Sequence, residues 1–133
     1  MRIADSVDGN SVEDMRLWER NGRLYGSLVV ANFSGRKVTC RVGYGEISVS
    51  EHSAVVNDLT FPDYGANNGT ALEKNWVFFE HGGETHFIYA GSPEQTVVRM
   101  GYGLPRQEWK TPALEWKWGQ IRGGTSPLPF RGK

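Results

Sequence analysis

The chain has 133 residues, and its 15 Lys and Arg residues balance 15 Asp and Glu residues, so its formal net charge is zero. This length corresponds to one domain, and the balanced charge argues against a nucleic acid or an anionic membrane as the partner. With 17 glycines, five tryptophans and no helical periodicity in its apolar residues, the chain is predicted to be all-β.

The N-terminal residues 1–12 are polar and contain glycine and serine, so we expect an irregular lead-in. They lack the apolar core of a signal peptide, and no apolar run in the chain approaches the ~20 residues that span a bilayer. We therefore expect a soluble, cytoplasmic protein without a membrane partner.

The first predicted hairpin has strands at 15–20 and 23–32, joined by Asn21-Gly22, a dipeptide that favours a type I′ turn. Apolar and polar residues then alternate, as in strands with one solvated face. These further strands are predicted at 37–42, 46–50 and 54–61, and the loop at 62–69 is the predicted boundary of the unit.

A single cysteine, Cys40, falls in the strand predicted at 37–42. No intrachain disulfide can therefore form, and we expect a structural strand residue. His52, His81 and His86 lack the spacing of metal ligands, and the sequence has no nucleotide-binding fingerprint. The sequence therefore predicts neither a metal site nor a cofactor.

Residues 74–89 repeat the pattern of the first hairpin, with Gly82-Gly83 as the two-residue turn. Aligning Asp14 with Asn75 places the two hairpins in the same register, with Asn21-Gly22 opposite Gly82-Gly83. A second match aligns residues 34–45 with 92–103, which predicts a second copy that is slightly shorter than the first.

A period of about 50–60 residues with four short strands is typical of a β-propeller blade. The predicted arrangement is a partial β-propeller, with one blade at about 12–66, a second at about 72–118 and the start of a third at about 121–133. Trp116 and Trp118 would share one face of a strand, where they either bind a sugar ring or seal a core.

The first strand of each propeller blade lines the central channel, so the residues that open the three copies are expected to converge. The copies open with Glu-Asp-Met-Arg at 13–16, Glu-Lys-Asn-Trp at 73–76 and Arg-Gly-Gly-Thr at 122–125. Asp14, Asn75 and Gly124 should occupy one repeat position, with the first strands of the three copies side by side about one sheet. Four charged side chains are expected to gather at one end of a groove: Asp14, Arg16, Lys74 and Arg122.

These openings resemble the blade starts of five-bladed propeller carbohydrate-active proteins. They are most similar to the family of β-mannoside phosphorylases and hydrolases, whose blades begin with Glu-Asp-Pro-Arg. Met15 stands where that motif has proline. The resemblance covers two to two and a half of five blades, which implies a fragment or a truncated relative of such a protein.

The resemblance also implies roles for individual residues. Asp14 is the implied catalytic acid or acceptor of a sugar hydroxyl, oriented by Glu13 and Arg16. The other implied substrate-binding residues are Lys74 and Asn75 as hydrogen-bond donors, Trp76 as a stacking platform or packing residue, Arg122 as a ligand for an anionic or polyhydroxyl group, and Thr125.

The leading hypothesis is glycan processing of the glycoside hydrolase or phosphorylase type, with a carbohydrate or glycoside as partner, and phosphate in the case of phosphorolysis. No second carboxylate accompanies Asp14 on a channel-facing strand, because Glu19 and Glu80 flank the hairpin turns. The alternatives are a non-catalytic carbohydrate-binding module and a purely structural remnant. Because two blades leave aromatic faces uncovered, we expect the isolated chain to self-associate and to lack turnover.

Overall fold

The computed structural model describes residues 2–3, 10–65, 67, 72–91, 94–101, 104–112, 115–119, 121 and 124–127. The first sheet holds β1 (Arg2–Ile3), β2 (Asn10–Arg20), β3 (Arg23–Ser34), β4 (Lys37–Val49) and β5 (Ala54–Thr60). The second sheet holds β6 (Val77–His81), β7 (Glu84–Ala90), β8 (Thr96–Gly101) and β9 (Leu104–Lys110).

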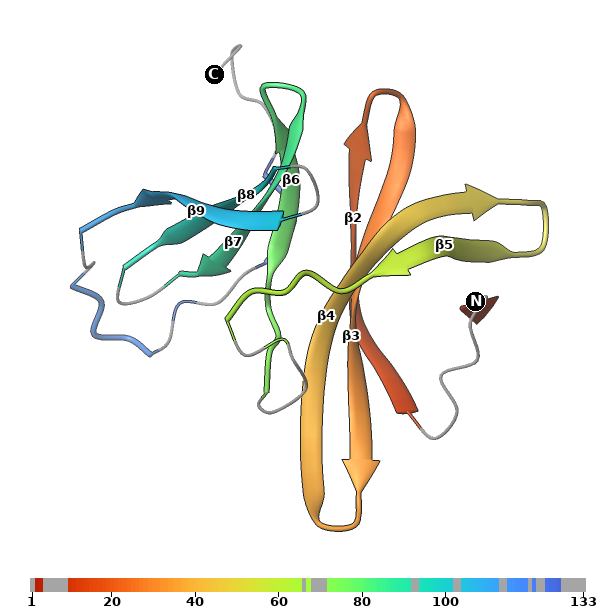
Figure 1. Cartoon of the computed structure of the whole chain (residues 1–133), viewed down its shortest axis with the longest axis horizontal. Coiled ribbons are helices and arrows are strands. Elements are labelled where there is room, and N and C mark those ends of the chain that lie inside the picture. The colour runs from red at the N-terminus through yellow and green to blue at the C-terminus, as the bar shows by residue number, and fades with distance from the viewer. Residues whose placement is uncertain are drawn as a thin grey trace.

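Within these residues the chain forms strands and no helix, so the predicted all-β class is confirmed. The strand orders are β1-β5-β4-β3-β2 and β6-β7-β8-β9 (Figure 1). Neighbouring strands are antiparallel, except that β1 runs parallel to β5. None of the described residues belongs to a helix that could cross a membrane.

Two local predictions about the first sheet are wrong. Part of the expected lead-in is ordered, because β1 pairs with β5 and β2 already begins at Asn10. The strands predicted at 37–42 and 46–50 are one strand, β4, which pairs with β3 without interruption up to Glu46. Gly45 allows this continuity, because a Cβ at that position would collide with the carbonyl oxygen of Asn57 on β5.

The two hairpins matched by aligning Asp14 with Asn75 are equivalent. Trp18 pairs with Tyr25 in the first hairpin, and Phe79 pairs with His86 in the second. Both turns place two successive residues in the left-handed region, with φ of 51° and 73° at Asn21-Gly22 and of 60° and 78° at Gly82-Gly83. This is the geometry of a type I′ turn, and the predicted equivalence of the hairpins is confirmed.

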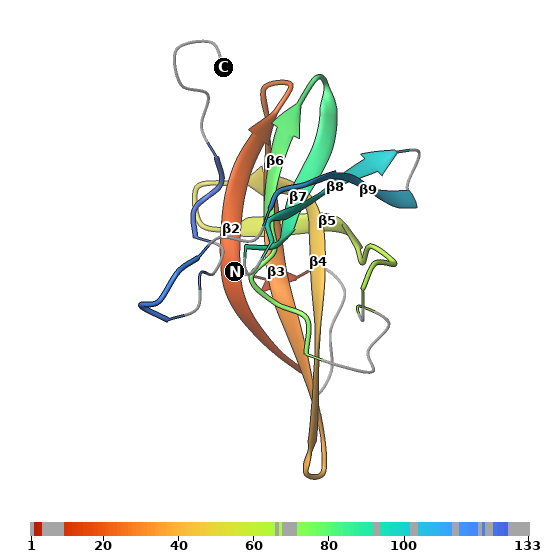
Figure 2. The ribbon, with the colours of Figure 1, turned by 90° about the vertical axis from the view of Figure 1, so that its left-hand side faces the viewer.

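The third strands do not follow the predicted alignment of 34–45 with 92–103. Gly26 pairs with Gly45 in the first sheet, and its equivalent Phe87 pairs with Val98 in the second. The structure therefore matches Gly45 to Val98, and not to Gly103 as the sequence alignment does. The β3–β4 hairpin is longer than the β7–β8 hairpin and protrudes from the rest of the chain in Figures 1 and 2. Local sequence likeness misplaced this register, because the hairpin length sets it.

An ion pair occupies the same place in both sheets with its charges exchanged. Arg23 Nη1 lies 3.0 Å from Glu46 Oε2 in the first sheet, and Arg99 Nη1 lies 3.0 Å from Glu84 Oε2 in the second. The match of the hairpins makes Arg23 equivalent to Glu84, and the match of Gly45 to Val98 makes Glu46 equivalent to Arg99. The equivalent strand pairing of the two sheets therefore extends to this ion pair between side chains.

The two sheets pack face to face through aromatic residues. Trp18 of the first sheet stacks on Phe78 of the second, and Tyr44 of the first sheet also contacts Phe78, each at 5.1 Å between ring centroids. Phe78 is completely buried, whereas its equivalent Leu17 is 51% exposed on the other face of the first sheet. Equivalent positions thus differ in burial because Phe78 packs against the neighbouring sheet, whereas no sheet of the described residues packs on Leu17.

The segment between the sheets is fixed to β4 by one buried asparagine. The Asn67 side chain accepts from the Val42 N–H at 2.6 Å and donates to the carbonyl oxygens of Val42 and Pro62 at 3.0 and 2.7 Å. The described residues of the predicted boundary loop, 62–65 and 67, lie outside the strands. This segment therefore connects the last strand of the first sheet to the second sheet.

β9 is an edge strand, and this position explains how it contains a proline. Pro105 pairs with Met100 on β8, and no strand of the described residues lies on the other side of β9. A proline is tolerated at an edge because the N–H that it lacks can be one that would point away from the sheet. Most of the predicted third copy, including residues 122–123 and 128–133, lies outside the described residues.

The unequal burial of equivalent positions gives a stability prediction. Phe78→Ala should lower the free energy of unfolding by about 3–5 kcal/mol, because it leaves a cavity between the sheets. Leu17→Ala, the matched control at the equivalent position, should cost less than about 1 kcal/mol because Leu17 is half exposed. Urea denaturation of both variants measures the difference, and equal losses would contradict the packing described here.

Candidate functional site

The residues that open the first two copies share an unusual backbone conformation. Asp14 has φ of 53°, and Asn75, its repeat equivalent, has φ of 64°. Asp14 lies in the register shift of β2 between Glu13 and Arg16, while Asn75 precedes β6. Asp and Asn adopt this left-handed region more readily than other residues with a side chain.

One guanidinium group joins the openings of all three copies. Arg16 Nε donates to the carbonyl oxygen of Gly124 at 2.9 Å, and its terminal nitrogens lie 3.5 Å from Asn75 Oδ1 and from the carbonyl oxygen of Asp14. We call these four residues the junction. Asp14, Asn75 and Gly124 therefore meet at Arg16. The prediction that the first strands share one sheet is wrong, because β2 and β6, which lie in contact, belong to different sheets.

Several predicted site residues around the junction face solvent. Glu13, Asp14, Lys74 and Thr125 are exposed, whereas Arg16 and Asn75 are partly buried. The Ser11 hydroxyl donates to Glu13 Oε1 at 3.5 Å. This end of the molecule therefore presents two carboxylates, an ammonium and a hydroxyl to solvent. The predicted contribution of Arg122 lies outside the described residues.

Trp76 packs between the sheets, which is the second of the two roles considered for it from the sequence. Its side chain is only 1% exposed, and its ring lies parallel to Phe87 between the sheets. Its Nε1 donates to Glu73 Oε2 at 3.1 Å, and the other oxygen of Glu73 accepts from the Tyr89 hydroxyl at 3.1 Å. Burial, together with the Glu73 carboxylate, raises the pKa of Tyr89 above its ordinary value.

Sequence reasoning missed the structural roles of Glu73 and Asn67. Both are buried polar residues whose side chains bond groups distant in sequence, Glu73 to Tyr89 and Asn67 to Val42. No signal in the sequence points to either role, because these partners lie 16 and 25 residues away along the chain. Their hydrogen bonds satisfy polar groups that would be costly to bury unpaired.

Trp116 and Trp118 lie outside any strand, and neither ring seals a core. They are 47% and 72% exposed, and their rings meet edge to face at 4.9 Å with an angle of 71° between the planes. Of the two roles considered from the sequence, core sealing is wrong. The rings form an exposed corner, and each offers a face to a ligand.

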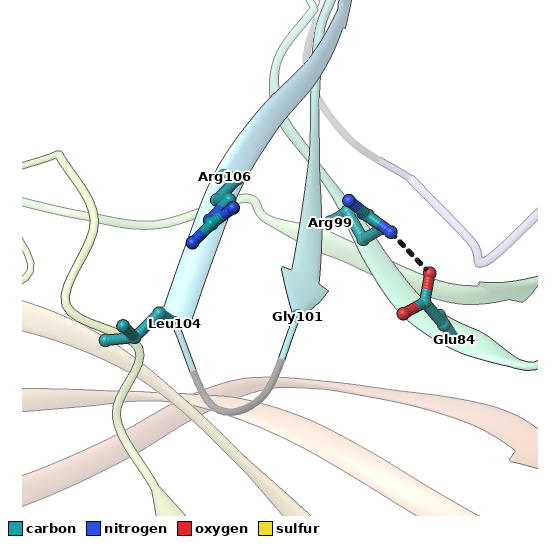
Figure 3. Close-up of a pocket in the computed structure, with 5 residues that line it drawn as sticks. All are labelled: Glu84, Arg99, Gly101, Leu104 and Arg106. Atoms are coloured by element: carbon teal, nitrogen blue, oxygen red, sulfur yellow. Dashed lines mark hydrogen bonds and ion pairs between the residues drawn. The ribbon is translucent and has the colours of Figure 1, made fainter.

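A pocket of about 220 Å³ lies on the second sheet, away from the predicted site residues. Its lining residues are Glu84, Arg99, Gly101, Leu104 and Arg106 (Figure 3). Glu84 binds Arg99 within the pocket wall, and Glu108 Oε2 lies 2.8 Å from Arg99 Nε. The hydrogen bond from Arg99 to Glu84 and the charges of Glu108 and Glu84 raise the pKa of Arg99.

Among the described residues, no group of three or more His, Cys, Asp and Glu side chains could hold a metal ion. None of the three histidines therefore takes part in such a group there. His86 instead lies between two rings, at 5.6 Å from Phe79 and 5.3 Å from Trp109. Cys40 is buried in the core between the sheets, in agreement with the structural role predicted for it. Comparison of the chain with protein-family models, curated proteins and solved structures found no match.

The junction gives a second stability prediction. Arg16→Lys keeps the charge but replaces the planar guanidinium fork with a single ammonium, which cannot reach both Gly124 and Asn75 in the same way. We expect a loss of about 1 kcal/mol in unfolding free energy and faster amide hydrogen exchange at residues 124–127. Arg36→Lys, on the exposed turn between β3 and β4, is the control. Unchanged exchange at 124–127 would show that Arg16 does not hold this segment.

Proposed function

We propose that the two sheets are consecutive blades of a β-propeller, and that the exposed polar residues around the junction bind a carbohydrate without cleaving it. The observation that carries this proposal is the Arg16 guanidinium, which joins the equivalent openings of three repeats. In a propeller, equivalent first strands meet at the central channel. The junction then marks one end of that channel.

The packing of the sheets supports the blade arrangement. Trp18 faces the second sheet, whereas its equivalent Phe79 faces away from the first sheet, on the opposite side from Phe78. The first sheet therefore meets the second with the face whose equivalent on the second sheet points away from the first. This relation generates the radial arrangement of propeller blades.

The chemistry of the exposed groups supports a polyhydroxylated ligand. Glu13 and Asp14 offer acceptors, Lys74 offers donors, and Thr125 offers a hydroxyl that acts as either. Sugar hydroxyls both donate and accept, so a mixed set of this kind suits them better than it suits a polyanion. The resemblance of the repeat openings to carbohydrate-active propellers points to the same class of ligand.

The position of Asp14 favours binding over catalysis. A general acid for glycoside cleavage works best when apolar surroundings enclose it and a second carboxylate lies across the sugar. Asp14 is exposed on a strand bulge, and the neighbouring buried carboxylate, Glu73, already accepts hydrogen bonds with both oxygens. A hydrolase or phosphorylase of the kind expected from the resemblance remains the competing outcome of the test.

Binding is tested by titrating the chain with manno-oligosaccharides in a calorimeter. Asp14→Gly removes the carboxylate and suits the positive φ, so binding should weaken about tenfold or more through the lost hydrogen bond. Asp58→Gly is a matched control, because Asp58 is also exposed and has φ of 48°. Equal affinities of the parent chain and the Asp14 variant would contradict the proposed site.

An assay with aryl glycosides, and with manno-oligosaccharides plus phosphate, separates binding from catalysis. We expect no turnover in either assay. Turnover that disappears in Asp14→Asn while binding persists would instead establish the enzyme, with Asp14 as its acid.

A further inference from the structure

One face of the second sheet points away from the first sheet. On it Arg106 and Trp109 are exposed, whereas His86 is only 2% exposed because it lies between its stacking partners. A row of directly opposed residues crosses β6 to β9 on this face, namely Phe79, His86, Arg99 and Arg106. Trp109 lies on the same face and stacks on His86 at 5.3 Å. These five residues define the free face, and Figure 3 shows the hollow beside Arg99 and Arg106.

The free face is built like the face of the first sheet that the second sheet covers. Trp18 and Tyr25 stack at 5.5 Å with 26° between their planes, and their equivalents Phe79 and His86 stack at 5.6 Å with 24°. Beside each stack lies one of the charge-exchanged ion pairs described above. The free face therefore repeats the stacked pair and the ion pair of a surface already used for packing within the chain.

The chain also carries the counterpart of that surface. On the covered face, Trp18 is met by Phe78, whose repeat equivalent is Leu17. Leu17 and Leu24 are exposed large apolar residues, and their strand positions place them on the outer face of the first sheet. Beside these two leucines the outer face is already packed, with Leu28, Val30 and Ile47 buried in a cluster of their own. The free face and the Leu17–Leu24 part of the outer face are thus the repeat equivalents of two surfaces that meet within the chain.

We propose that copies of this chain associate head to tail, with the free face of one copy covering Leu17 and Leu24 of the next. Such heterologous contacts close into rings when the rotation per copy allows it. The ring completes the channel whose end the junction marks. The association rests on the blade arrangement proposed above and not on the ligand.

The test is the molar mass of the chain in solution, measured by light scattering and sedimentation velocity over a range of concentrations. The parent chain should have a mass of at least twice 14.9 kDa. Phe79→Glu and Leu17→Glu should each reduce it to a monomer, because each places a charge in one half of the interface. Val38→Glu, an exposed apolar position on the β3–β4 hairpin, is the control and should keep the parent mass.

Mixing the two variants provides the sharper test. Phe79→Glu retains an intact outer face and Leu17→Glu an intact free face, so an equimolar mixture should form dimers with a single good interface. Trp109→Glu replaces Phe79→Glu if circular dichroism shows that the latter does not fold. A parent chain that stays monomeric overturns the proposal. Failure of the two variants to complement each other also overturns it. So does an effect of only one variant, which would indicate that two identical faces pair.

Binding of carbohydrate and association can fail separately. A ring that binds no manno-oligosaccharide keeps the head-to-tail association and refutes the carbohydrate site. A monomer that binds manno-oligosaccharide through Asp14 refutes the association alone.

Discussion

The contact on which the rest of the structure depends is the stacking of Trp18 on Phe78. It joins the two sheets through rings 5.1 Å apart and nearly parallel, and both rings are buried in the core between the sheets. Burying aromatic side chains supplies a large share of the apolar stabilisation available to a chain of this size. Because the contact fixes one face of each sheet against the other, it also determines which equivalent residues are buried and which are exposed.

The polar residues of the junction depend on this packing. Arg16 lies on β2 of the first sheet, and Asn75 lies just before β6 of the second. They meet only because β2 and β6 lie in contact. The left-handed conformations of Asp14 and Asn75 let the backbone change direction at the same point of each repeat. Packing of the apolar faces and positioning of the polar end are therefore consequences of one arrangement of repeats.

The sequence predicted the features that depend on local chemistry. Asn21-Gly22 and Gly82-Gly83 specify their turns through residues that accept positive φ, so both hairpins were predictable. The register of β4 and β8 was not, because the likeness of residues 34–45 to 92–103 says nothing about hairpin length. The role of Trp76 could not be predicted either, since an aromatic residue next to polar ones serves equally well as a platform or in a core. Only the position of Phe87 on the neighbouring strand decides between them.

The exchanged ion pairs show why the two copies have few identical residues although their strand pairing is equivalent. Arg23 with Glu46 and Glu84 with Arg99 give the same interaction at the same distance, yet no residue of the pair is retained between the copies. Likewise Trp18 with Tyr25 and Phe79 with His86 give the same stack from different rings. What the two copies share is the complementarity of the face, which many pairs of side chains can supply. A face kept complementary without a covering strand among the described residues is the physical reason to look for that partner in another copy.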